Sequence, residues 1–89
     1  MLDAGAVNVL RKSGKSLLAV GIKAVEGCFR RGELVLCLDS EGNEVARGLV
    51  NYKSEEIVLI KGQVSGQFES ILGYSDDEEV IHRDNLVLV

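Results

Sequence analysis

The sequence contains no proline and no tryptophan, and only one histidine and two cysteines occur among its 89 residues. Proline is the usual marker of rigid linkers, so its absence leaves no visible boundary inside the chain. No apolar run approaches the roughly 20 residues that a membrane-spanning helix needs. These absences predict a single domain, residues 1–89, with no membrane-spanning segment.

The two cysteines, Cys28 and Cys37, have no partners at the spacing of a metal site, and two are too few to staple a secreted fold. The first residues of the chain contain no basic segment followed by an apolar one, so nothing indicates export. We therefore interpret both cysteines as small apolar core residues of a cytoplasmic protein and expect no disulfide between them.

An amphipathic helix is predicted near the start of the sequence, over Asp3–Lys12. Asp3 is a favourable N-cap, apolar residues recur on one face, and Gly14 can adopt the left-handed conformation that ends a helix. The pattern then changes to an alternation of period two, which predicts a strand over Leu17–Val25.

A β-hairpin is predicted in the middle of the chain. Leu34–Leu38 is a continuous apolar run of strand length, and Glu44–Tyr52 would form its partner strand. Between them, Asp39–Asn43 has the chemistry of a turn, because Gly42 or Asn43 can adopt a positive φ.

Two short helices are predicted after the hairpin. Ser54 would cap the first, which would end at Gly62, and Ser65 would cap the second, which would end at Gly73. Apolar residues at helical spacing would face the core from both helices.

Two short strands, Val80–His82 and Leu86–Val89, are predicted to follow, with a tight turn at residues 83–85 between them. The complete order of elements is thus a helix, three strands, two short helices and two strands. Because helices and strands do not alternate one by one, this order predicts an α+β domain built on a small curled or closed sheet.

The segment Ser13–Ser16 matches the end of a phosphate-binding loop. However, the first glycine of that motif would fall on Val9, and the preceding residues are predicted to form a helix rather than a strand. We therefore interpret the segment as the end of a helix followed by the start of a strand.

Two other features could support chemistry. The acidic run Asp76–Glu79 offers oxygen ligands for Mg²⁺ or Ca²⁺, but no glycine-punctuated loop accompanies it, so we interpret it as a solvated loop. His82 is the only histidine, and we expect its ring to hydrogen-bond the turn that follows it rather than to transfer protons. We predict no catalytic residue, no metal site and no cofactor-binding residue in this chain.

The charge is unevenly distributed along the chain. In residues 1–31, six Lys and Arg stand against two carboxylates, a net charge of +4; the remaining residues carry four against twelve, a net charge of −8, which together give the formal −4. A cationic face could contact phosphates of RNA, although the negative total opposes binding of a polyanion. The alternatives are a solvated face or a surface that docks on an acidic partner. The candidate phosphate contacts are Lys12, Lys15, Lys23, Arg30 and Arg31.

Three segments, Lys15–Ile22, Arg47–Tyr52 and Glu79–Val87, resemble the PUA domain found at the C-terminus of the glutamate 5-kinase family. The resemblance covers nearly the whole chain. The segment Leu2–Ala6 is similar to the family's internal Val-Asp-x-Gly-Ala, where the kinase domain connects to the PUA fold. The resemblance implies a PUA-like pseudo-barrel of mixed strands with short flanking helices, and a chain that is the tail of a longer protein.

The same resemblance implies a parent enzyme that phosphorylates L-glutamate with ATP to give γ-glutamyl phosphate, the first step of proline biosynthesis. Its ATP and Mg²⁺ sites would lie on a separate amino-acid kinase domain, so this chain would serve as an accessory or regulatory domain without catalysis. Its expected partner is that kinase domain, within a parent that forms a homo-oligomer. Because PUA domains of RNA-modifying enzymes recognise RNA, the alternative is an RNA-binding module that uses the five cations.

Overall fold

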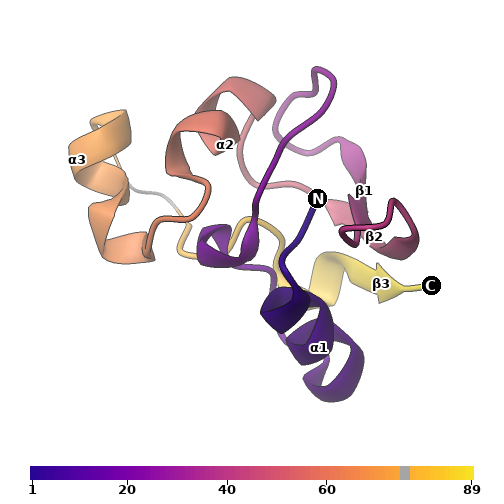
Figure 1. The fold of residues 1–89 in the computed structure, drawn as a ribbon. Helices are drawn as coiled ribbons and strands as arrows, with labels where there is room; N and C mark the ends of the chain where they lie inside the picture. Colours follow the sequence, from indigo (N-terminus) through magenta and orange to yellow (C-terminus); the bar gives the residue numbers. More distant parts are fainter. Residues whose placement is uncertain (75–76) are drawn as a thin grey trace.

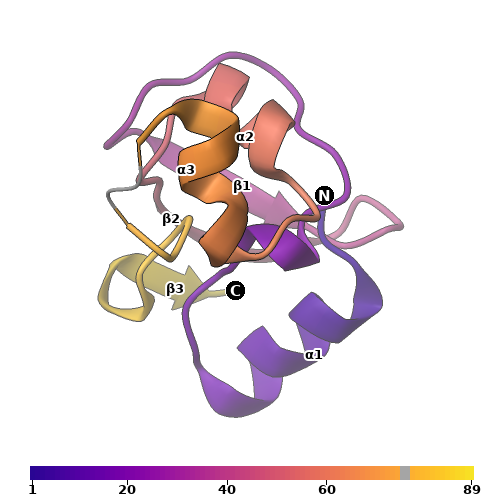
Figure 2. The ribbon, with the colours of Figure 1, turned by 90° about the vertical axis from the view of Figure 1, so that its left-hand side faces the viewer.

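The computed structural model describes residues 1–74 and 77–89. An antiparallel sheet of three strands, in the order β1 (Leu34–Leu38), β2 (Glu44–Leu49) and β3 (Leu86–Leu88), lies on one side of the core. Figures 1 and 2 show that α2 (Ser54–Ile60) and α3 (Phe68–Leu72) lie on the other side, while α1 (Ala4–Ser13) lies at one end. Three short 3₁₀ turns complete the fold: η1 (Ala19–Gly21), η2 (Ser65–Gln67) and η3 (Arg83–Asn85). The predicted α+β class is confirmed.

Helix α1 forms as its terminal residues predict. The Asp3 side chain accepts a hydrogen bond from the backbone N–H of Ala6 at 2.7 Å, which satisfies one of the free donors of the first turn. Gly14 ends the helix in the left-handed conformation, with φ of 57°. Leu10 is buried against the core. Both predicted caps of this helix are therefore confirmed.

The strand predicted over Leu17–Val25 is wrong. Leu17 and Ile22 each form only an isolated bridge, and η1 lies between them. The reason is contact with α1, because a Cβ on Gly21 would lie 2.5 Å from the Cβ of Ala6. Glycine allows this close approach, so the segment turns against α1 instead of continuing as a strand.

Isolated backbone contacts close the sheet into a ring. The N–H of Leu2 donates to the carbonyl of Leu38 at the end of β1, and Leu2 also forms a bridge with Ile22. On the other side, the N–H of Asn51, just after β2, donates to the carbonyl of Val80, and the neighbouring Ile81 pairs with Leu17. Single bridges thus take the place of full strands in the ring.

The hairpin of β1 and β2 is confirmed, with Leu34 opposite Leu49 and a bulge after Cys37. In its turn, the Asp39 carboxylate accepts hydrogen bonds from the N–H groups of Glu41 and Asn43, and Gly42 has a φ of 85°. The Asn43 N–H bond is the main reason that the pKa of Asp39 is lowered. The second strand is shorter than predicted and ends at Leu49. Beyond it, Val50 still exchanges backbone hydrogen bonds with Gly32 and Glu33, outside the regular pairing of the two strands.

The two short helices form, but their predicted N-caps are wrong, because Lys53 is the N-cap of α2 and Gln67 is that of α3. The C-cap of the first helix is Lys61, one residue before the predicted Gly62. Ser54 is the first residue of α2, and its hydroxyl instead donates to the carbonyl of Phe29 and accepts from the same residue's N–H. Ser65 begins η2, and its hydroxyl donates to the carbonyl of Glu78. Gly73, with φ of 83°, ends α3 as predicted. Both serine hydroxyls therefore hydrogen-bond backbone groups that are distant in sequence instead of capping their own helices.

The end of the chain is only partly as predicted. Val80–His82 is not a strand but contributes the single bridge of Ile81, whereas β3 forms within the predicted Leu86–Val89. Between them, the Nδ1 atom of His82 accepts a hydrogen bond from the N–H of Asp84 at 3.1 Å. The expected bond from the histidine ring to the turn is confirmed.

The interpretation of the cysteines is half right. Cys37 is buried, and its burial raises the pKa of its thiol to about 11. Cys28 is exposed in the loop before β1, so its interpretation as a core residue was wrong. Both thiols are free, as expected.

Candidate functional site

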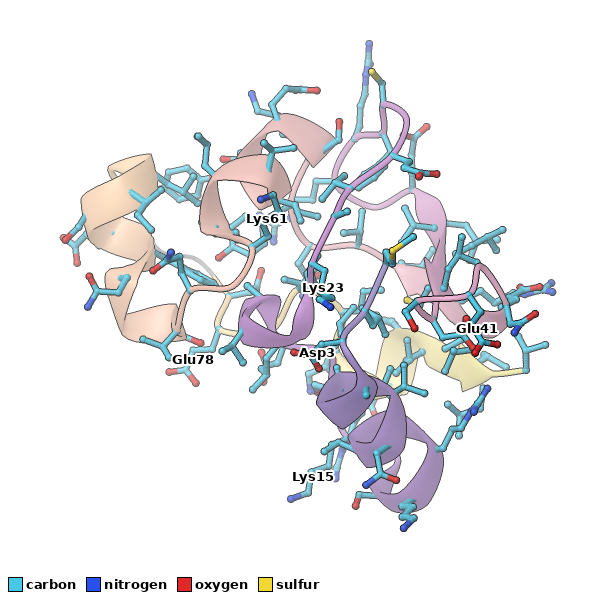
Figure 3. All side chains as sticks on the ribbon, viewed as in Figure 1. Asp3, Lys15, Lys23, Glu41, Lys61 and Glu78 are labelled. Atoms are coloured by element: carbon cyan, nitrogen blue, oxygen red, sulfur yellow. The ribbon has the colours of Figure 1, made fainter. Side chains whose placement is uncertain are left out.

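The structure distributes the five predicted cations over different parts of the molecule. Lys12 is in the last turn of α1 and Lys15 follows that helix, whereas Arg30 and Arg31 lie in the long loop before β1. Figure 3 shows Lys15 beside the lower part of α1 and Lys23 near the middle of the molecule. Figure 1 shows that the loop before β1 lies at the opposite end from α1. The five side chains therefore do not form one compact cationic face.

Arg30 and Arg31 line a hollow of about 550 Å³ between the loop before β1 and the start of α2. Lys53 adds a third cation there, but the same hollow contains Glu33, Glu55 and Glu56. Arg31 also pairs with Asp77, with Nη2 3.0 Å from Oδ2. The cations and carboxylates balance, so this hollow has no strong field to attract a polyanion.

The phosphate-loop-like segment Ser13–Ser16 takes a structural role. Its glycine ends α1, and the hydroxyl of Ser16 accepts a hydrogen bond from the backbone N–H of Arg83 at 2.9 Å. A phosphate-binding loop instead connects a strand to the start of a helix. The interpretation as a helix end is confirmed.

The acidic run lies partly outside the described residues, because Asp76 is not among them. The backbone carbonyl of Asp77 accepts a hydrogen bond from the hydroxyl of Tyr52, and the Asp77 carboxylate pairs with Arg31. Within residues 1–74 and 77–89, no three His, Cys, Asp or Glu side chains meet where they could hold a metal ion. The Asp77 side chain therefore serves as a local structural partner.

A different surface, which sequence reasoning missed, lies on the side of the sheet away from α2 and α3. We call it the outer sheet face and define it by five residues: Leu34, Leu36, Arg47, Leu49 and Val87. The exposed fractions of the four apolar ones are 61%, 57%, 43% and 64% in chain order. The continuous run Leu34–Leu38 was the available signal. We interpreted it only as a strand, although antiparallel strands with one solvated face usually alternate apolar and polar residues.

The longest described helix, α1, has 10 residues. No helix in the described ranges has the length and apolar character needed to cross a bilayer. Together, the ring of strands and bridges, α2 and α3 on one side of the sheet and the exposed outer sheet face define a small α+β module.

A sequence profile of the PUA domain matches residues 1–72. The chain belongs to the PUA domain family. Among solved structures, a PUA domain from Aeropyrum pernix superposes with a TM-score of 0.64 at 23% identity, covering 91% of this chain and 39% of that one. A PUA domain protein from Thermoplasma acidophilum gives a TM-score of 0.56 at 28% identity, covering 64% of this chain and 37% of that one.

Curated relatives with high identity are glutamate 5-kinases. The chain is 66% identical to that of Saccharophagus degradans over 99% of its length, 60% identical to that of Hahella chejuensis over 100%, and 61% identical to that of Pseudomonas putida over 100%. It covers 24%, 23% and 24% of these relatives, respectively. The chain thus spans about a quarter of their length and matches their C-terminal part.

Proposed function

We propose that this chain is the C-terminal accessory domain of a cytoplasmic, homo-oligomeric glutamate 5-kinase. The parent would use ATP and Mg²⁺ to phosphorylate L-glutamate to γ-glutamyl phosphate in proline biosynthesis. The amino-acid kinase domain would carry the catalytic residues and both cofactor sites. The present chain would influence the assembly or regulation of the enzyme without taking part in the chemistry.

The observation that carries this proposal is the 66% identity to the Saccharophagus degradans glutamate 5-kinase, which extends over 99% of this chain. Similarity along the entire domain, rather than at one motif, supports a shared role and not only a shared fold. The geometry agrees, because the residues that resembled a phosphate-binding loop end a helix and His82 bonds its own turn.

A domain exchange tests the proposal. We expect the isolated chain to give no glutamate-dependent release of ADP. We expect a fusion in which this chain replaces the matching quarter of the Saccharophagus degradans enzyme to keep kcat/KM within about threefold of that enzyme, a change of less than about 1 kcal/mol in transition-state stabilisation. Turnover by the isolated chain, or a folded but inactive fusion, would contradict the proposed role.

RNA binding through Lys12, Lys15, Lys23, Arg30 and Arg31 is the alternative to this proposal, and the net charge of +4 in residues 1–31 is the observation in its favour. The separation of these side chains and the carboxylates beside Arg30 and Arg31 favour the first proposal. We therefore expect no measurable binding of structured RNA to the isolated chain even at low salt. The measurement is a fluorescence-anisotropy titration repeated across a range of salt concentrations.

Measurable binding of structured RNA would support the alternative if it depended on salt and on the predicted cations. Affinity would fall steeply with salt, because each neutralised phosphate releases counterions. Lys15→Glu and Arg31→Glu would each weaken the binding, whereas Lys61→Glu, outside the predicted set, would serve as a matched control. An equal effect of all three substitutions would indicate only non-specific attraction.

A further inference from the structure

We propose that the outer sheet face docks this domain onto the kinase portion that precedes it in a glutamate 5-kinase chain. The inference rests on the proposed function, and it adds which surface of the domain makes the contact. Its occupant is the preceding part of the same polypeptide, not a second copy of this domain and not a nucleic acid.

The outer sheet face is continuous across all three strands. Leu36 is directly opposite Arg47, and Arg47 is directly opposite Val87, so these side chains form one row across β1, β2 and β3. Leu34 and Leu49 form a neighbouring pair two positions away, on the same face. The face is therefore one surface and not a set of scattered apolar residues.

The composition of this face suits a protein partner. Its single cation, Arg47, already pairs with Glu44, with Nε 2.8 Å from Oε1. The other side of β1 contacts the core through Val35 and Cys37, so this strand is apolar on both sides. An antiparallel strand with one solvated face normally carries polar residues there, and apolar residues on both sides indicate a second packing partner.

The place of the first residues, taken together with the length of the relatives, favours the kinase portion as that partner. Met1 lines a hollow together with the loop of residues 26–29 and with Leu34, Leu36 and Leu38 of β1. The N–H of Leu2 donates to the carbonyl of Leu38. The N-terminal residues therefore lie between residues 22–24 and the end of β1, beside two leucines of the outer sheet face. In the relatives, about three quarters of the polypeptide precedes the matching segment.

A domain attached at Met1 would be held next to this face at high effective concentration. Contacts between domains of one chain are usually modest in area and can be built from one small surface. The outer sheet face, at the point where the chain enters the domain, fits such a contact better than surfaces on the far side of the molecule.

Cysteine labelling can measure whether the face is covered. The probes are Leu36→Cys and Val87→Cys, made singly, and the control is Leu59→Cys on α2, whose native side chain is 58% exposed. All variants carry Cys28→Ser, which removes the exposed native thiol; Cys37 stays unreactive because it is buried and its pKa is about 11. Maleimide labelling rates are read by mass spectrometry of peptides from this domain.

The rates are compared between the isolated chain and the fusion with the Saccharophagus degradans kinase portion. We expect the fusion to slow labelling at positions 36 and 87 by about tenfold or more, since a covered thiol reacts only when the contact opens. Labelling at position 59 should change by less than about twofold. Equal rates at positions 36 and 87 in the two proteins would overturn the proposal.

Labelling at positions 36 and 87 could also be slow in the isolated chain and become slower as protein concentration rises. That result would overturn the proposal too, because it would assign the outer sheet face to contact with a second copy of the domain. The labelling rates test the docking surface, whereas glutamate-dependent turnover of the fusion tests the proposed function, so the two can fail separately. An active fusion with unprotected probes would refute the docking surface alone. An inactive fusion with protected probes would refute the accessory role alone.

Discussion

Replacing Phe68 by alanine should lower the free energy of unfolding by about 3–5 kcal/mol, the cost typical of deleting a large buried aromatic side chain. Phe68 begins α3, has an exposed fraction of 0% and packs edge-to-face against Tyr52, with ring centroids 5.8 Å apart. A domain of this size has a total stability of about 5–10 kcal/mol. The variant should therefore be close to unfolding at room temperature.

Urea denaturation followed by circular dichroism checks this expectation. The matched control is Leu59→Ala on α2, because that side chain is 58% exposed and should contribute less than about 1 kcal/mol. Phe68→Leu, which keeps most of the buried volume, should recover part of the loss. Equal midpoints for Phe68→Ala and Leu59→Ala would mean that α3 does not contribute to the core.

Replacing Gly48 by alanine should destabilise the protein by about 1–3 kcal/mol, because the added methyl group has no space. A Cβ at this position would lie 2.6 Å from the backbone oxygen of Asn85 and 2.8 Å from Cγ2 of Ile81. The first of these atoms belongs to the turn that leads into β3 and cannot rotate away. The strain would therefore fall on the pairing of β2 with β3.

The expected result is a lower midpoint of thermal unfolding, together with faster hydrogen exchange in β3 than in α1. Gly66→Ala is the matched control, since no atom lies within 4 Å of a Cβ built on Gly66. It should be neutral or slightly stabilising. If Gly48→Ala and Gly66→Ala had the same stability, the close approach of the turn at Asn85 would not constrain this strand.

The fold class and most element positions could be predicted because their signals are local. Asp3 and Gly14 define the ends of α1 within a few residues of its sequence, and Gly42 and Gly73 mark chain reversals that favour a positive φ. Errors arose where a distant contact competed with a local preference. Ser54 is a good cap in isolation, but its hydroxyl bonds the backbone of Phe29 instead.

The candidate sites were less predictable than the fold. Counting charges located a basic third of the sequence, yet charge in sequence does not determine distance in space, and the structure separates Lys15 from the loop that carries Arg30 and Arg31. The outer sheet face was missed for the converse reason. Leu34 and Leu36 are residues of the kind that usually form a core. They are exposed because no element that the structure describes packs over them.

The sequence by itself determined the α+β class, both ends of α1, the central hairpin and the resemblance to the PUA family, because capping, turn chemistry and apolar periodicity act over a few neighbouring residues. The tertiary structure decided which glycines allow close contacts, which serine hydroxyls bond distant backbone groups instead of capping a helix, and which apolar side chains stay exposed. Those outcomes depend on segments far apart in the chain, such as Gly48 and Asn85, whose contact no local pattern encodes.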